Sequence, residues 1–386
     1  MPPSLQRYRA QGRREGVDEA VLSNALTVIG RIRATDPRIT PVLTLRHLSQ
    51  LIDVPYLHLR DLIGRRVEGS YKIFHLRKRV PGRTSTRMIC TPSTTLLSIQ
   101  RWIVTNVLRY TTPHQASYAF HPGGRPLEAA EEHCGCSWLL KVDLQDFFHT
   151  ISEGQIAKVF TEIGFNRLLS FELARLVTIE CMRPPLPDTT ARWPVIPRYQ
   201  SKGEGMLPQG APTSPMLSNL VMAKTDAILA DLARAYGMRY SRYADDLAFS
   251  CGNENNEAYV RRFKRLVLRC LNEAGFRPNL RKTVIRGPGS RRIVLGMLVD
   301  GDGDQQSIQQ RIIRCQHLNL GAMLNGKGKR RKDRCFRHTL PIPQHHQPTL
   351  GQALRYGFIA AYHGRRVARG QVGVQAREQG GQGGFA

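Results

Sequence analysis

The chain has 386 residues, 41% of them hydrophobic, which is enough to bury the cores of two or three structural units. Lysine and arginine outnumber aspartate and glutamate by 57 to 30, which gives a formal net charge of +27. Because this excess runs through the whole chain, it favours a polyanionic partner such as nucleic acid over a ribosome-associated or merely solubilising basic surface.

The apolar residues and the cysteines exclude two further classes of protein. No stretch has the length and apolar character of a membrane span, and residues 1–14 lack the apolar core of a signal peptide. The 8 cysteines follow no disulfide framework and are expected to be thiols. We interpret the cluster of His133, Cys134 and Cys136 as coincidence rather than a metal site, because no second ligand pair stands at suitable spacing. A cytoplasmic protein without a membrane partner is therefore expected.

Residues 1–68 carry the apolar spacing of helices. Apolar side chains recur at helical intervals over residues 45–52 and 57–63, on either side of a break at Pro55. The sequence therefore predicts a small helical region at the N-terminus.

The pattern changes to extended segments after this region. Residues 71–76 and 87–90 read as two short strands, joined by the basic, turn-forming sequence 79–83. The apolar residues over 96–107 then follow a helical period with one buried face. A basic hairpin followed by a helix is predicted here.

A short apolar run over residues 138–143 ends in a carboxylate. Its length and flanks predict a buried strand with Asp143 at the end, and a helix is expected to start near Ser152. Residues 183–205 are rich in proline and arginine without periodicity, so we expect a surface loop there.

The following residues alternate between helical and extended patterns. A helix is expected after Pro215, then a hairpin over 240–250 with acidic residues at its tip, then a helix to about Gly275. A further strand pair is expected over 283–285 and 292–299. The predicted fold is therefore mixed α+β.

A dense basic block lies near the C-terminus, over residues 325–338. It suits a loop that binds a nucleic-acid backbone. The nucleic-acid-binding residues expected there are Lys327, Lys329, Arg330, Arg331, Lys332 and Arg334. The last dozen or so residues are of low complexity and are expected to be disordered.

Three aspartates carry the clearest chemical signal. Asp245 and Asp246 stand side by side in an apolar hairpin, and Asp143 ends an apolar strand. A single aspartate in such a place is more simply a turn residue or a helix cap. Three together are costly unless a cation offsets them, and phosphoryl transfer by two metal ions requires such clustered carboxylates.

The motifs around these aspartates resemble those of one family. In chain order they are Val142-Asp143-Leu144-Gln145-Asp146-Phe147-Phe148, Leu207-Pro208-Gln209-Gly210-Ala211-Pro212-Thr213-Ser214-Pro215 and Tyr243-Ala244-Asp245-Asp246. All three, in this order, are similar to the motifs of bacterial reverse transcriptases of the retron and group II intron kind, over roughly residues 45–325. A lone four-residue motif would be far less specific.

The resemblance implies a right-hand polymerase fold with fingers, a palm built on an antiparallel sheet, and a helical thumb. The ranges that it implies are an N-terminal helical region at 1–68, fingers at 69–138, a palm at 139–290 with a finger insertion at about 155–205, primer-grip strands and a basic thumb at 291–372, and a disordered tail at 373–386.

The resemblance also assigns catalytic roles. Asp143 and Asp245, with the backbone carbonyl of Leu144, would hold two Mg²⁺ ions, for which Mn²⁺ can substitute. Asp246 would be the adjacent carboxylate, also counted among the metal ligands, near the primer terminus. Lys282 resembles the lysine that protonates the departing pyrophosphate, with an ordinary exposed lysine as the alternative.

Five residues are expected to contact the incoming nucleotide. Lys78 and Arg87 resemble finger residues that grip the triphosphate, with solvated surface charge as the alternative. Phe148 resembles the aromatic gate that excludes a ribose hydroxyl, and the alternative for it is a core phenylalanine. Gln209 and Gly210 fit a site where an amide and a backbone without Cβ approach a nucleotide closely.

Within the family, the retron group is the most similar, and two departures stand out. Ala129 begins Ala-Ala-Glu-Glu-His where retron enzymes carry Asn-Ala-x-x-His, and Leu295 replaces the threonine of their Val-Thr-Gly. The resemblance implies a dedicated structured noncoding RNA as template, DNA as product, deoxynucleoside triphosphates as substrates, an effector protein and a role in antiphage defence.

The alternatives are a group II intron maturase, a catalytically idle RNA-binding protein on the same scaffold, and an RNA-dependent RNA polymerase or primase. The tail offers no zinc or nuclease signature for a maturase, and all three carboxylates are present. Phe148 disfavours ribonucleotide synthesis, because that activity needs room for the ribose hydroxyl.

Overall fold

The computed structural model describes residues 5–80, 83–180, 204–252 and 256–300. The chain divides into two compact units. Unit 1 holds the described residues up to Thr111 and those between Glu153 and Gly205, and unit 2 holds Thr112–Ser152 and the described residues from Met206 onward. The basic block, the low-complexity tail and nearly all of the loop expected over 183–205 lie outside the described residues. The domain ranges drawn from the sequence stay predictions.

Unit 1 is mainly helical and carries a long hairpin. Its elements are α1 (Leu5–Arg14), α2 (Glu19–Thr35), α3 (Leu45–Ile52), α4 (Tyr56–Ile63), β1 (Tyr71–Val80), β2 (Arg83–Pro92), α5 (Thr94–Asn106), the 3₁₀ helix η1 (Leu108–Tyr110), α8 (Glu153–Ile163), α9 (Arg167–Val177) and β4 (Ile179–Glu180).

The two helices predicted around the proline break are confirmed as α3 and α4. The Thr44 side chain accepts a hydrogen bond from the backbone N–H of His47 at 3.1 Å and so caps the start of α3. The helix ends at Asp53, whose φ of 52° is left-handed, and Pro55 then precedes α4. Leu48 and Leu59 are fully buried and anchor the two helices in the core of this unit.

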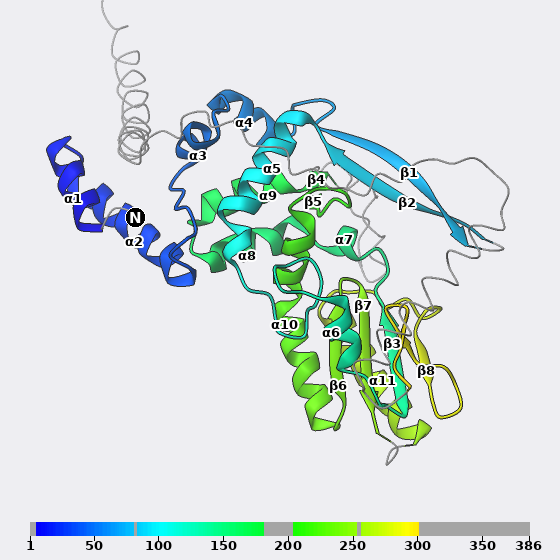
Figure 1. Ribbon diagram of the computed structural model, residues 1–386. Coiled ribbons are helices and arrows are strands. Elements are labelled where there is room, and N and C mark those ends of the chain that lie inside the picture. Colours follow the sequence, from blue (N-terminus) through cyan, green and yellow to red (C-terminus); the bar gives the residue numbers. More distant parts are fainter. Residues whose placement is uncertain (1–4, 81–82, 181–203, 253–255, 301–386) are drawn as a thin grey trace, which may run out of the picture. The chain divides into compact units, whose positions relative to one another are not determined.

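The predicted basic hairpin is confirmed and is longer than expected. β1 and β2 pair antiparallel from Tyr71 opposite Pro92 to Val80 opposite Arg83 (Figure 1). The apolar spacing identified only the segments near the body of the unit, because the distal halves of both strands are basic and polar.

Unit 2 is built on a sheet covered by helices. Its elements are α6 (Pro126–Glu131), β3 (Trp138–Asp143), α7 (Phe147–Thr150), β5 (Gly205–Met206, at the boundary with unit 1), α10 (Ser214–Ala235), β6 (Arg239–Tyr243), β7 (Asp246–Cys251), α11 (Glu257–Glu273), β8 (Val284–Arg286), β9 (Ile293–Val294) and β10 (Met297–Leu298). Four strands form one sheet in the order β6-β7-β3-β8, with every neighbouring pair antiparallel. The predicted α+β fold is confirmed.

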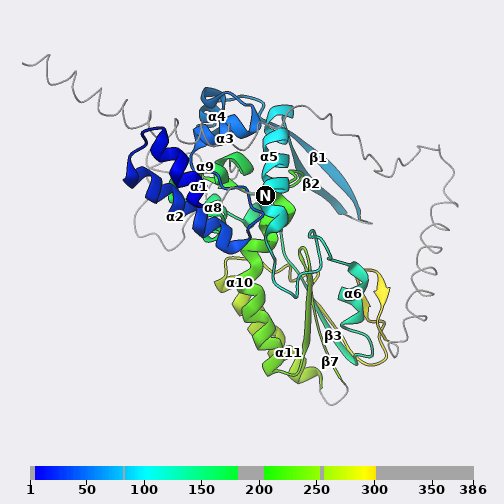
Figure 2. The same ribbon diagram turned by 60° about the vertical axis from the view of Figure 1, so that its left-hand side comes forward.

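The two faces of this sheet have different coverings. On one face Phe249 of β7 packs edge-on against Phe263 of α11, with ring centroids 5.2 Å apart, and α10 lies beside α11. On the other face Leu139 and Ala248 form a buried cluster with Ala130 of α6. Figure 2 shows α10 and α11 on one side of β3 and β7, and α6 on the other. We call these the helix face and the α6 face.

The prediction that residues 283–285 pair with residues 292–299 was wrong. β8 instead pairs with β3, with Leu140 opposite Ile285. The residues of 292–299 form a hairpin of their own, β9 and β10, around a two-residue turn. Leu295 and Gly296 have φ of 50° and 83°, as a type I′ turn requires. The sequence did not predict this because strand pairing depends on distant residues, and here β3 offered an edge.

The structure also bears on two expected absences. In the described part of the chain, no helix is both long and apolar enough to cross a membrane. The cysteines found there are thiols.

Candidate active site

The three aspartates meet at one end of the sheet in unit 2. Asp143 is the last residue of β3 and lies directly opposite Asp246, the first residue of β7. Tyr243 also pairs with Asp246, so Ala244 and Asp245 form the two-residue turn between β6 and β7. Ala244 has a φ of 57°, the conformation that the first central residue of such a turn adopts. The turn therefore presents Asp245 beside the facing pair.

Asp143 is held by partners from the segment before β8. Its Oδ1 receives a hydrogen bond from Lys282 Nζ at 2.6 Å, and its Oδ2 receives one from Asn279 Nδ2 at 3.1 Å. The backbone N–H of Asn279 also donates to the Asp143 carbonyl at 2.7 Å. The Asp143 side chain is 10% exposed and that of Lys282 is 57% exposed. The carboxylate is thus fixed in the protein, whereas most of the lysine lies in solvent.

Burial and mutual repulsion act on the other two carboxylates. Burial raises the pKa of Asp245 above its ordinary value, and the charges of Asp246 and Asp143 raise it further. Burial also raises the pKa of Asp246, with Lys141 opposing the shift more strongly than any other cation and Asp143 adding to it. These acids are therefore held close together at a cost that a bound cation would relieve.

The donor atoms suit a hard divalent cation, which prefers carboxylate and carbonyl oxygens. Asp143 and Asp246 face each other across the strands, and Leu144 donates its backbone N–H to the Asp245 carbonyl at 3.0 Å, which ties the two motifs together. Within residues 5–80, 83–180, 204–252 and 256–300, no three histidine, cysteine, aspartate or glutamate side chains are grouped as a ready-made metal site. In this arrangement Lys282 and Asn279 take up the oxygens of Asp143. The residues fit such ions in donor type, and the role of the Leu144 carbonyl stays a prediction.

The two phenylalanines after Asp143 have different surroundings. Phe147 is 3% exposed and packs against Phe276, with ring centroids 5.9 Å apart. Phe148 is only partly buried, and its ring lies 5.5 Å from that of Phe147 and 6.4 Å from that of Phe120. Phe148 is therefore the one with a surface left to offer to a ligand, although its role as a gate stays a prediction.

Gln209 and Gly210 lie in the loop that precedes α10. This loop begins where the Leu207 N–H donates to the Ile151 carbonyl at 3.0 Å, just beyond α7. Gly210 is exposed and has a φ of 113°, which favours glycine, and Gln209 is partly buried. The loop is thus joined to the segment that carries Phe148.

The remaining predicted site residues belong to unit 1 or lie outside the described residues. Arg87 is exposed and pairs with Leu76 across the β hairpin, and Lys78 lies further along β1, opposite Ser85. The side chain of Lys78 is outside the described residues. The whole basic set from Lys327 to Arg334 is also outside them.

Sequence reasoning missed a buried polar network behind the turn that carries Asp245. Arg242 makes a bidentate ion pair with Asp226 of α10, at 2.8 Å from Nε and 2.6 Å from Nη2, and both side chains are fully buried. Arg242 Nη1 also donates to Asn219 Oδ1 at 2.9 Å and to the Ala244 carbonyl at 3.1 Å. The network therefore fixes the turn that carries Asp245. The spacing of Asn219 and Asp226, two helical turns apart, was the signal available in the sequence.

His133 is fully buried between α6 and the sheet. Its Nδ1 bonds to Ser250 Oγ and its Nε2 to Ser241 Oγ, both at 2.7 Å. Burial, followed by the charge of Arg239, lowers the pKa of His133 to about 3. Both ring nitrogens are thus engaged in clamping α6 to β6 and β7, and neither serves a metal.

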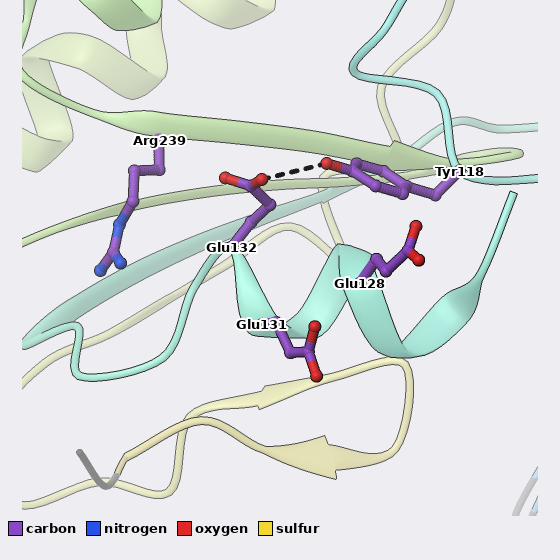
Figure 3. Close-up of a pocket in the computed structure, with 5 residues that line it drawn as sticks. All are labelled: Tyr118, Glu128, Glu131, Glu132 and Arg239. Carbon is purple, nitrogen blue, oxygen red and sulfur yellow. Dashed lines mark hydrogen bonds between the residues drawn. The ribbon is translucent and has the colours of Figure 1, made fainter. Parts of the chain in front are cut away.

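A hollow of about 480 Å³ lies beside α6, where the helix faces Arg239 of β6 and Tyr118 (Figure 3). It is lined by the side chains Tyr118, Glu128, Glu131, Glu132 and Arg239, and Tyr118 donates to Glu132 at 3.2 Å. The hollow contains none of the three aspartates. Its carboxylates repel phosphate, so we do not count it with the site of the three aspartates.

The geometry can be compared with known proteins. Residues 76–299 match the model of the family described as reverse transcriptase (RNA-dependent DNA polymerase). The chain is 31% identical over 229 residues to the Retron Ec86 reverse transcriptase of Escherichia coli, covering 59% of this chain and 63% of that protein. It is 33% identical over 227 residues to the Retron Mx162 reverse transcriptase of Myxococcus xanthus, covering 57% of this chain and 45% of that protein. The matched region thus spans between 45% and 63% of these curated relatives.

Among solved structures, the chain is similar to a telomerase from Candida albicans in complex with a fragment of telomeric RNA. The TM-score is 0.39 and the identity is 14%, covering 60% of this chain and 46% of that chain.

Proposed function

Because the chain belongs to the reverse transcriptase (RNA-dependent DNA polymerase) family, we propose that it copies a structured RNA into DNA as an RNA-directed DNA polymerase. Membership of this family confirms the predicted right-hand polymerase fold. The observation that carries the proposal is the register of the palm sheet, in which Asp143 faces Asp246 directly beside the turn residue Asp245.

The three aspartates are proposed to hold two Mg²⁺ ions, for which Mn²⁺ can substitute. Asp143 and Asp245 would be the principal ligands with the Leu144 carbonyl, and Asp246 would lie beside the primer terminus. When bound, the two ions supply the charge that activates the primer hydroxyl and stabilises the leaving oxygen.

Lys282 is proposed to protonate the departing pyrophosphate. Its side chain is 57% exposed and its ammonium is paired with the buried Asp143 at 2.6 Å. A long, largely solvated side chain of this kind can turn between a carboxylate and a phosphate within its own reach. This position beside Asp143 supports the role over that of an ordinary surface lysine.

Nucleotide selection is proposed to depend on five residues. Phe148 would exclude a ribose hydroxyl, with Gln209 and Gly210 against the base pair, and the partial burial of Phe148 supports its choice over Phe147. Lys78 and Arg87 would grip the triphosphate. The set proposed to bind the nucleic-acid backbone is Lys327, Lys329, Arg330, Arg331, Lys332 and Arg334.

The biological setting is proposed from the relatives, which are named as retron reverse transcriptases. We propose a dedicated structured noncoding RNA as template and deoxynucleoside triphosphates as substrates, with DNA as the product. We also propose an effector protein as partner and an antiphage role in the cytoplasm. The departures at Ala129 and Leu295 weaken the assignment to the retron group within the family.

The test is DNA synthesis by the full chain on a primed RNA template with Mg²⁺. Asp245→Asn is expected to lower the rate by about a thousandfold or more, because it removes a metal ligand. RNA affinity and its salt dependence should stay unchanged, since they depend on basic residues.

The matched control is Glu131→Gln, which removes a carboxylate of the α6 hollow in the same unit. It should leave synthesis and RNA binding as they are. Undiminished synthesis by Asp245→Asn would refute the site, and no synthesis by the unaltered chain would refute the activity.

A further inference from the structure

Phe120 combines two features that are unfavourable for a phenylalanine. Its side chain is 44% exposed, and its backbone φ of 65° lies in the left-handed region. A left-handed residue with a Cβ costs about 1 kcal/mol or more, and an exposed ring gains little from burial. Such a conformation persists only where the surroundings impose it, and it points to a role outside folding.

The surroundings do impose it. On one side, Asn219 of α10 donates from Nδ2 to the Ala119 carbonyl at 2.6 Å, within the buried network. On the other side, the Tyr118 N–H donates to the Arg242 carbonyl at 2.9 Å. After Phe120 the chain is tight as well, because a Cβ on Gly124 would lie 2.6 Å from the Tyr118 carbonyl oxygen. The backbone is therefore built to present this ring.

The ring of Phe120 lies between two aromatic residues of the candidate site. Its centroid is 6.4 Å from that of Phe148 and 6.2 Å from that of Tyr243, with both pairs tilted at about 45°. Tyr243 is the strand residue opposite Asp246. Phe120 thus joins the predicted sugar gate to the hairpin of the catalytic aspartates.

We propose that Phe120 is a specificity-determining residue that supports the sugar gate. This inference rests on the proposed function, in which Phe148 excludes a ribose hydroxyl. Phe148 would exclude the ribose hydroxyl by steric contact, so it is effective only if its ring cannot rotate away from the sugar. The Phe147 ring, 5.5 Å away, backs Phe148 on one side, and the Phe120 ring limits its movement on another. Without Phe120, the Phe148 ring gains freedom and a ribonucleotide can be admitted.

The variant Phe120→Gly tests this support. Glycine relieves the left-handed backbone while it removes the ring, so the fold should be retained. Single-nucleotide addition on a primed RNA template gives kcat/KM for a deoxynucleotide and for the matching ribonucleotide. We expect the ratio to fall by about tenfold, a size typical of an altered pocket wall, through faster ribonucleotide addition. A merely structural defect would slow the addition of both nucleotides.

Conservative and matched variants complete the test. Phe120→Tyr keeps the ring and should retain the original ratio. Phe120→Leu keeps an apolar side chain without the ring and should lower the ratio. If Phe120→Gly does not fold, Phe120→Leu provides the test. Phe171→Ala removes a ring of similar exposure, 46%, from α9 and should have no effect on the ratio.

The outcomes separate the two proposals. An unaltered ratio in folded Phe120→Gly or Phe120→Leu, with DNA synthesis intact, overturns the role of Phe120 alone. No deoxynucleotide addition by the unaltered chain overturns the proposed function and this inference with it.

Discussion

Unit 2 contains two groups of charged residues that lie close together in the chain. The charges of one group are fully neutralised within the protein, and those of the other are not. On the helix face, Arg242 and Asp226 are both fully buried and neutralise each other through two short hydrogen bonds. At the end of the same sheet, Asp143, Asp245 and Asp246 lie close together. The cation bonded to Asp143 is Lys282, whose side chain is mostly exposed. The first group is complete within the protein, and the second carries an excess of negative charge.

The difference separates a charge cluster that is neutralised within the fold from one that, in the proposed function, binds cations. A buried charge that serves the fold must be paired and hydrogen-bonded, because desolvation otherwise costs several kcal/mol. A cluster that is to bind a cation must keep part of its charge unsatisfied until the ligand arrives. The raised pKa values of Asp245 and Asp246 are the sign of this incomplete compensation. Stability measurements can test both halves of the comparison.

The largest effect is expected for Arg242→Met. It leaves the Asp226 carboxylate buried and unpaired, so the free energy of unfolding should fall by about 3–5 kcal/mol. Urea denaturation measures this change. The double variant Arg242→Met with Asp226→Leu should recover most of the loss, since it leaves no buried charge.

The control for this prediction is the surface pair Arg234 and Asp231, whose side chains are 72% and 70% exposed. Arg234→Met should change the free energy of unfolding by less than about 1 kcal/mol. If Arg242→Met were as mild, the buried pair would not be structural and the comparison would break.

A smaller effect on the free energy of unfolding is expected from His133. Like the pair of Arg242 and Asp226 it is buried and hydrogen-bonded within the fold, but it is neutral. Its pKa is lowered to about 3 in the folded protein, so below its ordinary value the unfolded chain binds more protons. Its contribution to the free energy of unfolding should therefore fall as the pH drops, by about 2 kcal/mol between about pH 6.5 and about pH 5.

The measurement compares the unaltered chain with His133→Asn over that pH range. The variant lacks the titrating ring, so the difference in unfolding free energy between the two should shrink as the pH falls. A difference that does not vary with pH would show that the ring takes up protons in the folded state as readily as in the unfolded chain.

The smallest effect is expected at the aspartates, and its sign is opposite. Asp246→Asn removes a like charge directly opposite Asp143, so the free energy of unfolding should rise by roughly 0.2–1 kcal/mol at neutral pH. Because the folded pKa of Asp246 is raised, this advantage should vanish as the pH falls through that pKa and the unaltered residue becomes neutral.

Added Mg²⁺ sharpens this prediction. It should raise the melting temperature of the unaltered chain, and raise that of Asp246→Asn less, because a ligand stabilises only the state that binds it. Glu131→Gln should respond to Mg²⁺ like the unaltered chain. A loss of stability in Asp246→Asn would mean that the aspartates are satisfied within the fold, which would remove the contrast.

The sequence predicted those elements whose signals are local. β3 was predicted over the residues it occupies, because an apolar run ends there at a charged residue, and α10 was expected from Pro215 at its first turn. The helices around Pro55 follow from the same kind of signal. In the site, Asp143, Asp245 and Asp246 were predicted as a set, and the structure brings them together.

The features that the sequence did not predict depend on contacts between distant residues. The spacing of Asn219 and Asp226 places both on one helix face, but no local pattern identifies Arg242 as their partner or assigns β8 to the edge of β3. Phe120 is the clearest case, because neither glycine nor asparagine marks its left-handed backbone. The hydrogen bond that Asn219 donates to Ala119, the one that the Arg242 carbonyl accepts from Tyr118, and the tight turn at Gly124 account for it.

The antiparallel pairing of β3 with β7 makes the length of these two strands critical. Successive side chains of a strand point to opposite faces, so inserting one residue within β3 would move every later side chain to the other face. Asp143 would then point towards α11 while Asp246 remained on the α6 face, with the sheet between them. Insertions in the loops of this unit are expected to alter affinity or stability by degrees, whereas one within β3 or β7 would separate the acids altogether.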